Sequence, residues 1–175
     1  MVVRILLGAV VVVAVVLLLA ATKPSRFHIE KSVTIHAPPE NLYALIADFH
    51  NWPQWAPQDR EDPTMQRTYR GAASGPGAVS EWTSRGSAGA GQMTITAATA
   101  SSTVDVVVEW KRPFKVRNAH RFTLTPTGSG TQITWSADGT NLYMMKVLEV
   151  FVGVNGLMGK HFEAGLGNLK KIGEQ

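Results

Sequence analysis

The chain opens with a long uncharged segment. Residues 5–21 carry no charged side chain and consist mainly of Val and Leu. Together with two valines just before it, this run, as a helix rising about 1.5 Å per residue, spans the ~30 Å hydrocarbon layer of a bilayer. A cleaved signal peptide is the alternative, because residues 20–22 are small, but its apolar region is usually only ~7–15 residues long. The pattern predicts a transmembrane anchor over residues 1–22 and a linker over residues 23–26.

The region after the linker alternates between apolar and polar positions. Residues 27–35 follow the period of a strand with one mostly buried face. Helical spacing predicts a short helix over residues 39–48, and two tryptophans among prolines in residues 51–57 predict a small helical turn. Six further strands, separated by Gly, Ser and Pro, are predicted over residues 65–70, 79–84, 92–100, 103–112, 115–125 and 131–138. The short links between them favour an antiparallel meander.

The C-terminal segment is helical by periodicity. Apolar residues recur every three or four positions over residues 147–172. Gly153, Gly156 and Gly159 lie inside this stretch, where each glycine costs about 1 kcal/mol relative to Ala, so they indicate a kink or a face that leaves room for a neighbour. A curled sheet of about seven strands cannot be filled by one helix. The sequence therefore predicts an α+β domain over residues 27–175 with a hollow between sheet and helix.

Composition removes several functional classes. The formal net charge is only +4 over 175 residues, and no basic run forms a stripe, so a nucleic-acid partner is not expected. The chain has no cysteine, which excludes disulfides and thiolate chemistry. The five histidines do not follow a metal-binding spacing, and neither a phosphate-binding loop nor a G-x-S-x-G nucleophile motif is present. We expect no metal and no cofactor.

Three segments carry a family resemblance. They are residues 32–39 (SVTIHAPP), Asp48 with residues 51–55 (NWPQW), and residues 159–170 (GKHFEAGLGNLK). The chain resembles the polyketide cyclase/dehydrase branch of the START-like (SRPBCC) superfamily. The resemblance implies a helix-grip fold, in which a curved antiparallel sheet of about seven strands wraps a long C-terminal helix and encloses a cavity for apolar ligands. Since the superfamily shares no catalytic set, the resemblance assigns no catalytic residue.

Strand parity and helix spacing nominate the residues that face this cavity. His120 is the titratable side chain that parity places among large apolar groups. It is interpreted either as a packed structural histidine or as a handle or acid/base group for a ligand. Asn118 and Asn155 are further polar candidates. The candidate ligand-binding residues are Trp82, Met93, Ile95, Val106, Val108, Trp110, His120, Phe122, Trp135, Phe151, Asn155, Met158 and Phe162.

These features lead to one favoured function and one alternative. The favoured function is membrane-tethered binding of a hydrophobic small molecule, such as a lipid, an isoprenoid or a polycyclic compound. The alternative is a polyketide cyclase or dehydratase with His120 as acid/base; we lean against an enzyme. The expected location is a cell membrane, through a single pass over residues 2–21. The side of the membrane, cleavage of the anchor, the ligand and the oligomeric state stay open.

Overall fold

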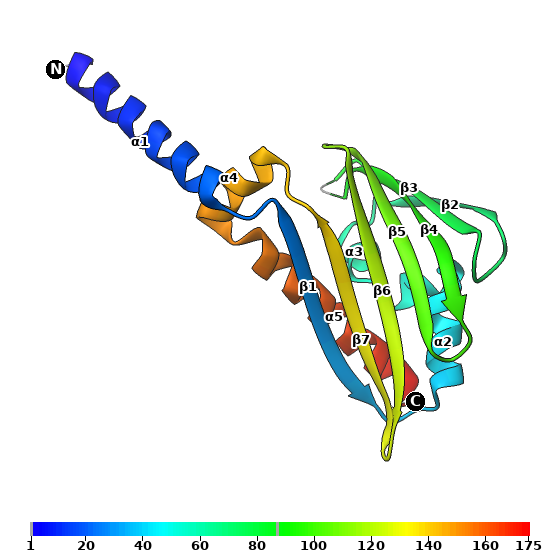
Figure 1. Cartoon of the computed structure of the whole chain (residues 1–175). Helices are drawn as coiled ribbons and strands as arrows, with labels where there is room; N and C mark the ends of the chain where they lie inside the picture. Colours follow the sequence, from blue (N-terminus) through cyan, green and yellow to red (C-terminus); the bar gives the residue numbers. More distant parts are fainter. Residues whose placement is uncertain (1, 87) are drawn as a thin grey trace.

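The computed structural model describes residues 2–86 and 88–175, without the side chains of residues 2, 5, 60, 61, 152, 154 and 155. Within that part, seven antiparallel strands form one curved sheet in the order β1-β7-β6-β5-β4-β3-β2 (Figure 1). Only the β1–β7 contact joins strands that are distant in sequence. The strands are β1 (Arg26–Ile35), β2 (Gln66–Gly71), β3 (Ala78–Thr83), β4 (Ala90–Thr99), β5 (Thr103–Arg112), β6 (Val116–Thr127) and β7 (Gly130–Thr140).

The helices lie in three places. Helix α5 crosses the sheet with its closest contacts on β1, and the group α2, η1 and α3 connects β1 to β2 (Figure 1). Helix α1 extends away from the sheet and contacts α4. The predicted α+β class, with a seven-stranded antiparallel sheet and a C-terminal helix, is confirmed as a helix-grip fold. The helices are α1 (Val2–Thr22), α2 (Pro39–Ala47), the 3-10 helix η1 (Phe49–Gln54), α3 (Pro57–Glu61), α4 (Tyr143–Val152) and α5 (Val154–Gly173).

Alternation along the central strands sets the inner face of the sheet. In β5 the side chains of Val104, Val106 and Val108 are buried. The register then fixes their neighbours: Val106 lies opposite Ile95 of β4 and His120 of β6. Because side chains alternate across a strand, the same parity places every second residue of β6 on this face.

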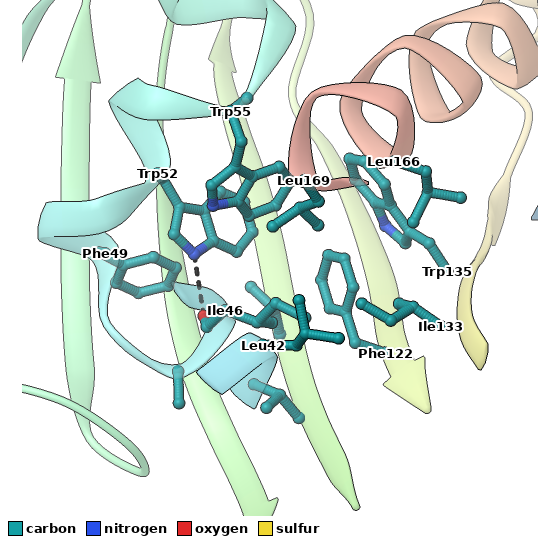
Figure 2. Close-up of a cluster of buried hydrophobic side chains, with 14 of the residues drawn as sticks. Leu42, Ile46, Phe49, Trp52, Trp55, Phe122, Ile133, Trp135, Leu166 and Leu169 are labelled. Carbon is teal, nitrogen blue, oxygen red and sulfur yellow. Dashed lines mark hydrogen bonds between the residues drawn. The ribbon is translucent and has the colours of Figure 1, made fainter. Parts of the chain in front are cut away.

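An aromatic cluster fills the end of the fold near α2 and η1 (Figure 2). Trp52 and Trp55 are 2% and 0% exposed, and their indole N–H groups donate to Ile46 O at 2.9 Å and Leu45 O at 3.2 Å. Phe122 meets both indoles edge-on. Buried indoles normally need such a hydrogen-bond partner. The two tryptophans are therefore packing residues of the core.

The C-terminal helical segment is broken at Gly153, which agrees with the kink among the two interpretations of its glycines. Gly153 has φ 63° and ψ 59°, in the left-handed region that glycine adopts without strain, and it ends α4 and precedes α5. Because the helix is interrupted here, a helical periodicity continued through Gly153 places the wrong face of α4 toward the interior. Phe151, predicted to point into the cavity, is 68% exposed.

Helix α1 stands apart from the domain and exposes apolar side chains along its length. Its end is held to α4, where the Tyr143 hydroxyl donates to Leu17 O at 2.7 Å. Over the described residues, no helix meets the combined length and hydropathy that crossing a membrane requires. The predicted transmembrane assignment of residues 1–22 is thus not supported here.

Trp55→Ala should lower the free energy of unfolding by about 3–5 kcal/mol, because it removes a fully buried ring and leaves a cavity. Phe151→Ala is the matched control and should change it by less than about 0.5 kcal/mol, since that ring is exposed. Urea unfolding followed by far-UV circular dichroism measures both. A large loss of unfolding free energy in the Phe151 variant would contradict the exposed position of this side chain on α4.

Candidate functional site

Two adjoining cavities lie between the sheet and α5. The mouth cavity, about 230 Å³, is lined by Phe27, Trp110, Pro113, Phe114, Val116, Asn118, Thr140, Asn141, Met145 and Met158. The inner cavity, about 80 Å³, is lined by Trp52, Gln58, Met93, Val108, Trp110, Asn118, His120, Trp135, Met158, His161 and Phe162. Trp110, Asn118 and Met158 belong to both linings. Together the two spaces come close to the lower end of the ~300–1,000 Å³ range of small-molecule sites.

The mouth cavity is built where several chain segments begin or end. Strands β5 and β6 bring Trp110 opposite Val116, just before and after their connecting turn. The first residues of β1 supply Phe27, and the end of β7 supplies Thr140. Met158 of α5 and Met145 of α4 close the space from the helical side. This end of the fold is also the one from which α1 and α4 project (Figure 1).

His120 is held by a tryptophan at the inner cavity. Trp135 Nε1–H donates to His120 Nδ1 at 3.1 Å, and the Phe162 ring lies 5.7 Å from the imidazole. Burial and, to a smaller extent, His161 lower the pKa of His120 to about 4, against an opposing effect of Asp138. The imidazole is therefore neutral at pH 7. Because Nδ1 accepts the hydrogen bond, the ring hydrogen resides on Nε2.

Asn118 is the other polar side chain common to the site. It is 6% exposed and lies on β6 two residues before His120, so both side chains belong to the inner face. Among the described residues, Asn118 Oδ1 is buried without a hydrogen-bond partner. Its cross-strand neighbour is Gly139 of β7.

The predicted ligand-binding residues fall into separate groups. Trp82 packs edge-on against Trp110 at 5.0 Å and donates to Ala88 O, and Phe122 belongs to the aromatic cluster. These two, with Ile95 and Val106, are buried in the core outside both linings. The candidates that line one or both cavities are Met93, Val108, Trp110, His120, Trp135, Met158 and Phe162.

Two predicted residues remain to be placed, and several residues that line the cavities were not predicted from the sequence. The prediction that Phe151 lines the cavity was wrong, because the break at Gly153 turns its side chain outward. The side chain of Asn155 lies outside the described residues. Asn118 was named as a polar candidate, and parity also places Val116 on the inner face, so Val116 could have been nominated. Phe27 lies on the apolar parity of its strand but was not nominated. The lining residues that gave no such signal are Trp52, Gln58, Pro113, Phe114, Thr140, Asn141, Met145 and His161.

A wider hollow of about 1040 Å³ lies elsewhere, near the turn between β3 and β4. Its lining includes Ser84, Arg85, Gly86 and Gly89. These residues flank position 87, which is not described, so we assign no site there.

A curved antiparallel sheet that holds an apolar cavity against its C-terminal helix defines a protein of the helix-grip fold. The model of the family described as polyketide cyclase/dehydrase and lipid transport matches residues 26–174. The chain belongs to this family.

Solved structures share the fold at low sequence identity. The di-domain aromatase/cyclase (ARO/CYC) StfQ from the steffimycin biosynthetic pathway has a TM-score of 0.67 at 10% identity, covering 85% of this chain and 51% of StfQ. The Aha1 dimer from Colwellia psychrerythraea has a TM-score of 0.60 at 14% identity, with 85% and 96% covered. Ara h 8.0201 has a TM-score of 0.56 at 18% identity, with 83% and 99% covered. Comparison with curated proteins gave no significant match.

The neutral state of the partly buried His120 predicts an acid-sensitive fold. A histidine with a lowered folded pKa binds more protons when unfolded, so its contribution to stability is complete above about pH 6.5 and is lost as the pH falls toward 4. Between pH 7 and pH 5 the wild type should lose about 2 kcal/mol more unfolding free energy than His120→Gln. His50→Gln, at an exposed position, is the control. Equal losses in wild type and His120→Gln would contradict a buried neutral imidazole.

Proposed function

We propose that this protein binds a hydrophobic small molecule in the mouth and inner cavities. The carrying observation is the lining itself: aromatic and methionine side chains surround the space, and a few uncharged polar groups stand among them. A mostly apolar pocket with a small number of placed polar groups is typical of small-molecule sites. Membership in a family described by cyclases, dehydrases and lipid transport agrees with such a ligand.

Binding is favoured over catalysis by the state of His120. A general base needs a nitrogen lone pair that faces the proton it removes. Here Nδ1 already accepts from Trp135, and Nε2 carries the ring hydrogen. A general acid would need the imidazolium, which a pKa of about 4 makes scarce at neutral pH. The aromatase/cyclase name of StfQ therefore suggests a related shape of ligand more than a reaction carried out by His120.

Membrane attachment through residues 2–21 is the second part of the proposal. Its support is the exposed apolar surface of α1, where Val10 and Leu18 are 65% and 69% exposed. Such side chains are costly in water and favourable in hydrocarbon. The mouth cavity lies at the end of the fold that carries α1, so an attached domain would present its opening near the lipid from which an apolar ligand can enter.

Met158→Trp should weaken binding of the neutral fluorophore Nile red at least tenfold, because the larger ring fills space common to both cavities. Leu157→Trp, at the adjacent but 52% exposed position, should leave the affinity unchanged. The saturable part of a fluorescence titration gives both affinities. Equal affinity in well-folded Met158→Trp would place the bound dye outside these cavities.

The full-length chain should remain with the membrane pellet after a carbonate wash, whereas a shortened chain that begins at Pro24 should appear in the supernatant. Replacing both Val11 and Val13 of α1 by Asp should also release the protein, because each charge at the centre of an inserted helix costs about 2.5–3.5 kcal/mol. Immunoblots of the two fractions measure the partition. Wild-type protein in the supernatant would refute the attachment.

A further inference from the structure

Asn118 presents a polar atom that the folded chain leaves unsatisfied. Its Oδ1 is buried and has no hydrogen-bond partner among the described residues. A buried acceptor without a partner costs free energy that the fold must offset elsewhere, and such groups are rare in native interiors. The residue lines both the mouth and the inner cavity. A donor that enters with the ligand would restore the missing hydrogen bond.

Gly139 leaves room for this acceptor and for the ring of Phe27. A Cβ at position 139 would overlap both Asn118 Oδ1 and the ring of Phe27. Phe27 itself lines the mouth cavity. The two side chains that border the cavity at this point therefore depend on a neighbour without a side chain, which indicates that the position of the Asn118 amide is tightly determined.

His120 adds a donor next to this acceptor. Its Nδ1 accepts from Trp135, so the hydrogen on Nε2 remains to be donated. Asn118 and His120 are two residues apart on the same face of β6, about 7 Å along the strand, and both line the inner cavity. A small group that both donates and accepts matches this pair. A hydroxyl has this capacity, and it can satisfy either end of the Asn118 amide.

The charge of the lining restricts the ligand further. Within the part of the chain that the structure describes, the residues lining the two cavities include no Lys, Arg, Asp or Glu. A carboxylate or phosphate placed in the mouth cavity, whose lining also has no histidine, would lose its hydration without gaining a cation. The polar groups Asn118, His120, Thr140 and Asn141 are all suited to a neutral partner.

We propose that the ligand is an apolar molecule with a neutral hydroxyl group, which donates to Asn118 Oδ1 and accepts from His120 Nε2–H. This proposal rests on the function proposed above, because it names the chemical class of the molecule that occupies the same cavities. It excludes fatty acid anions and phospholipid headgroups as the group bound at the Asn118 position.

Four probes with one carbon skeleton test the proposal in the full-length protein: naphthalene, naphthol, methoxynaphthalene and naphthoate. Quenching of tryptophan fluorescence reports binding, since Trp110 and Trp135 line the cavities. Naphthol should bind about tenfold more tightly than methoxynaphthalene, which lacks the donor, and naphthoate should bind most weakly of the four. The wild type alone gives this order, so the test does not depend on any variant folding.

Asn118→Leu should remove the preference for naphthol over methoxynaphthalene while retaining the affinity for naphthalene within about threefold. Asn51→Leu is the matched control: this residue of η1 lies outside both linings, its amide donates to Ala44 O at 3.1 Å, and the preference should persist.

The outcomes separate this proposal from the one on which it rests. Saturable binding of naphthalene with equal affinities for naphthol and methoxynaphthalene would overturn the hydroxyl assignment and leave apolar binding in place. A preference for naphthoate would overturn it in favour of an anionic ligand. Failure of all four probes to bind would refute the apolar cavity itself.

Discussion

The contact between α5 and Trp135 determines how closely the C-terminal helix approaches the sheet. The Trp135 and Phe162 rings stack with centroids 4.1 Å apart and planes 7° from parallel. One turn further along α5, Gly165 faces the indole so closely that a Cβ there would come within 2.9 Å of Trp135 Cζ3. The helix therefore packs tightly against the Trp135 indole at Phe162 and Gly165. Since α5 is straight and the sheet is curved, the space that remains lies toward the start of the helix, where Met158 borders both cavities.

The same indole links packing to chemistry. Its ring is part of the aromatic cluster, stacked on Phe122 at 4.9 Å, while its N–H holds the imidazole of His120. Burial keeps that imidazole neutral, and the hydrogen bond selects the tautomer with the hydrogen on Nε2. Strand parity marks His120 as a possible acid or base, but in the structure its Nε2–H is a hydrogen-bond donor held in one position. The core therefore determines the polarity of the binding site, and His120 cannot change its role without disturbing Trp135.

Periodicity predicted the strands well because most of them have one buried face. The predicted strand over residues 103–112 coincides with β5, and its parity places Val104, Val106 and Val108 in the interior. Parity names an inner face, but it does not distinguish a cavity from a filled core. Phe122 and Trp110 share this face, yet aromatic rings from η1 cover Phe122, whereas Trp110 stays at the open end. The mouth cavity also depends on chain ends and turns, such as Phe27 and Phe114, whose proximity follows from topology alone.

The break at Gly153 explains both the wrong assignment of Phe151 and the shape of the open end. With a continuous helix, the stripe that buries Phe162 and Leu166 would carry Phe151 inward as well. The left-handed glycine instead redirects α4 toward α1, so Met145 reaches the mouth cavity from the side while Tyr143 bonds to Leu17. The exposed apolar residues Met144, Leu148 and Phe151 then lie on a helix that contacts both α1 and the cavity wall. Helix α4 therefore contacts both α1 and the opening of the cavity, whereas the inner cavity is bordered by the stack of α5 on Trp135.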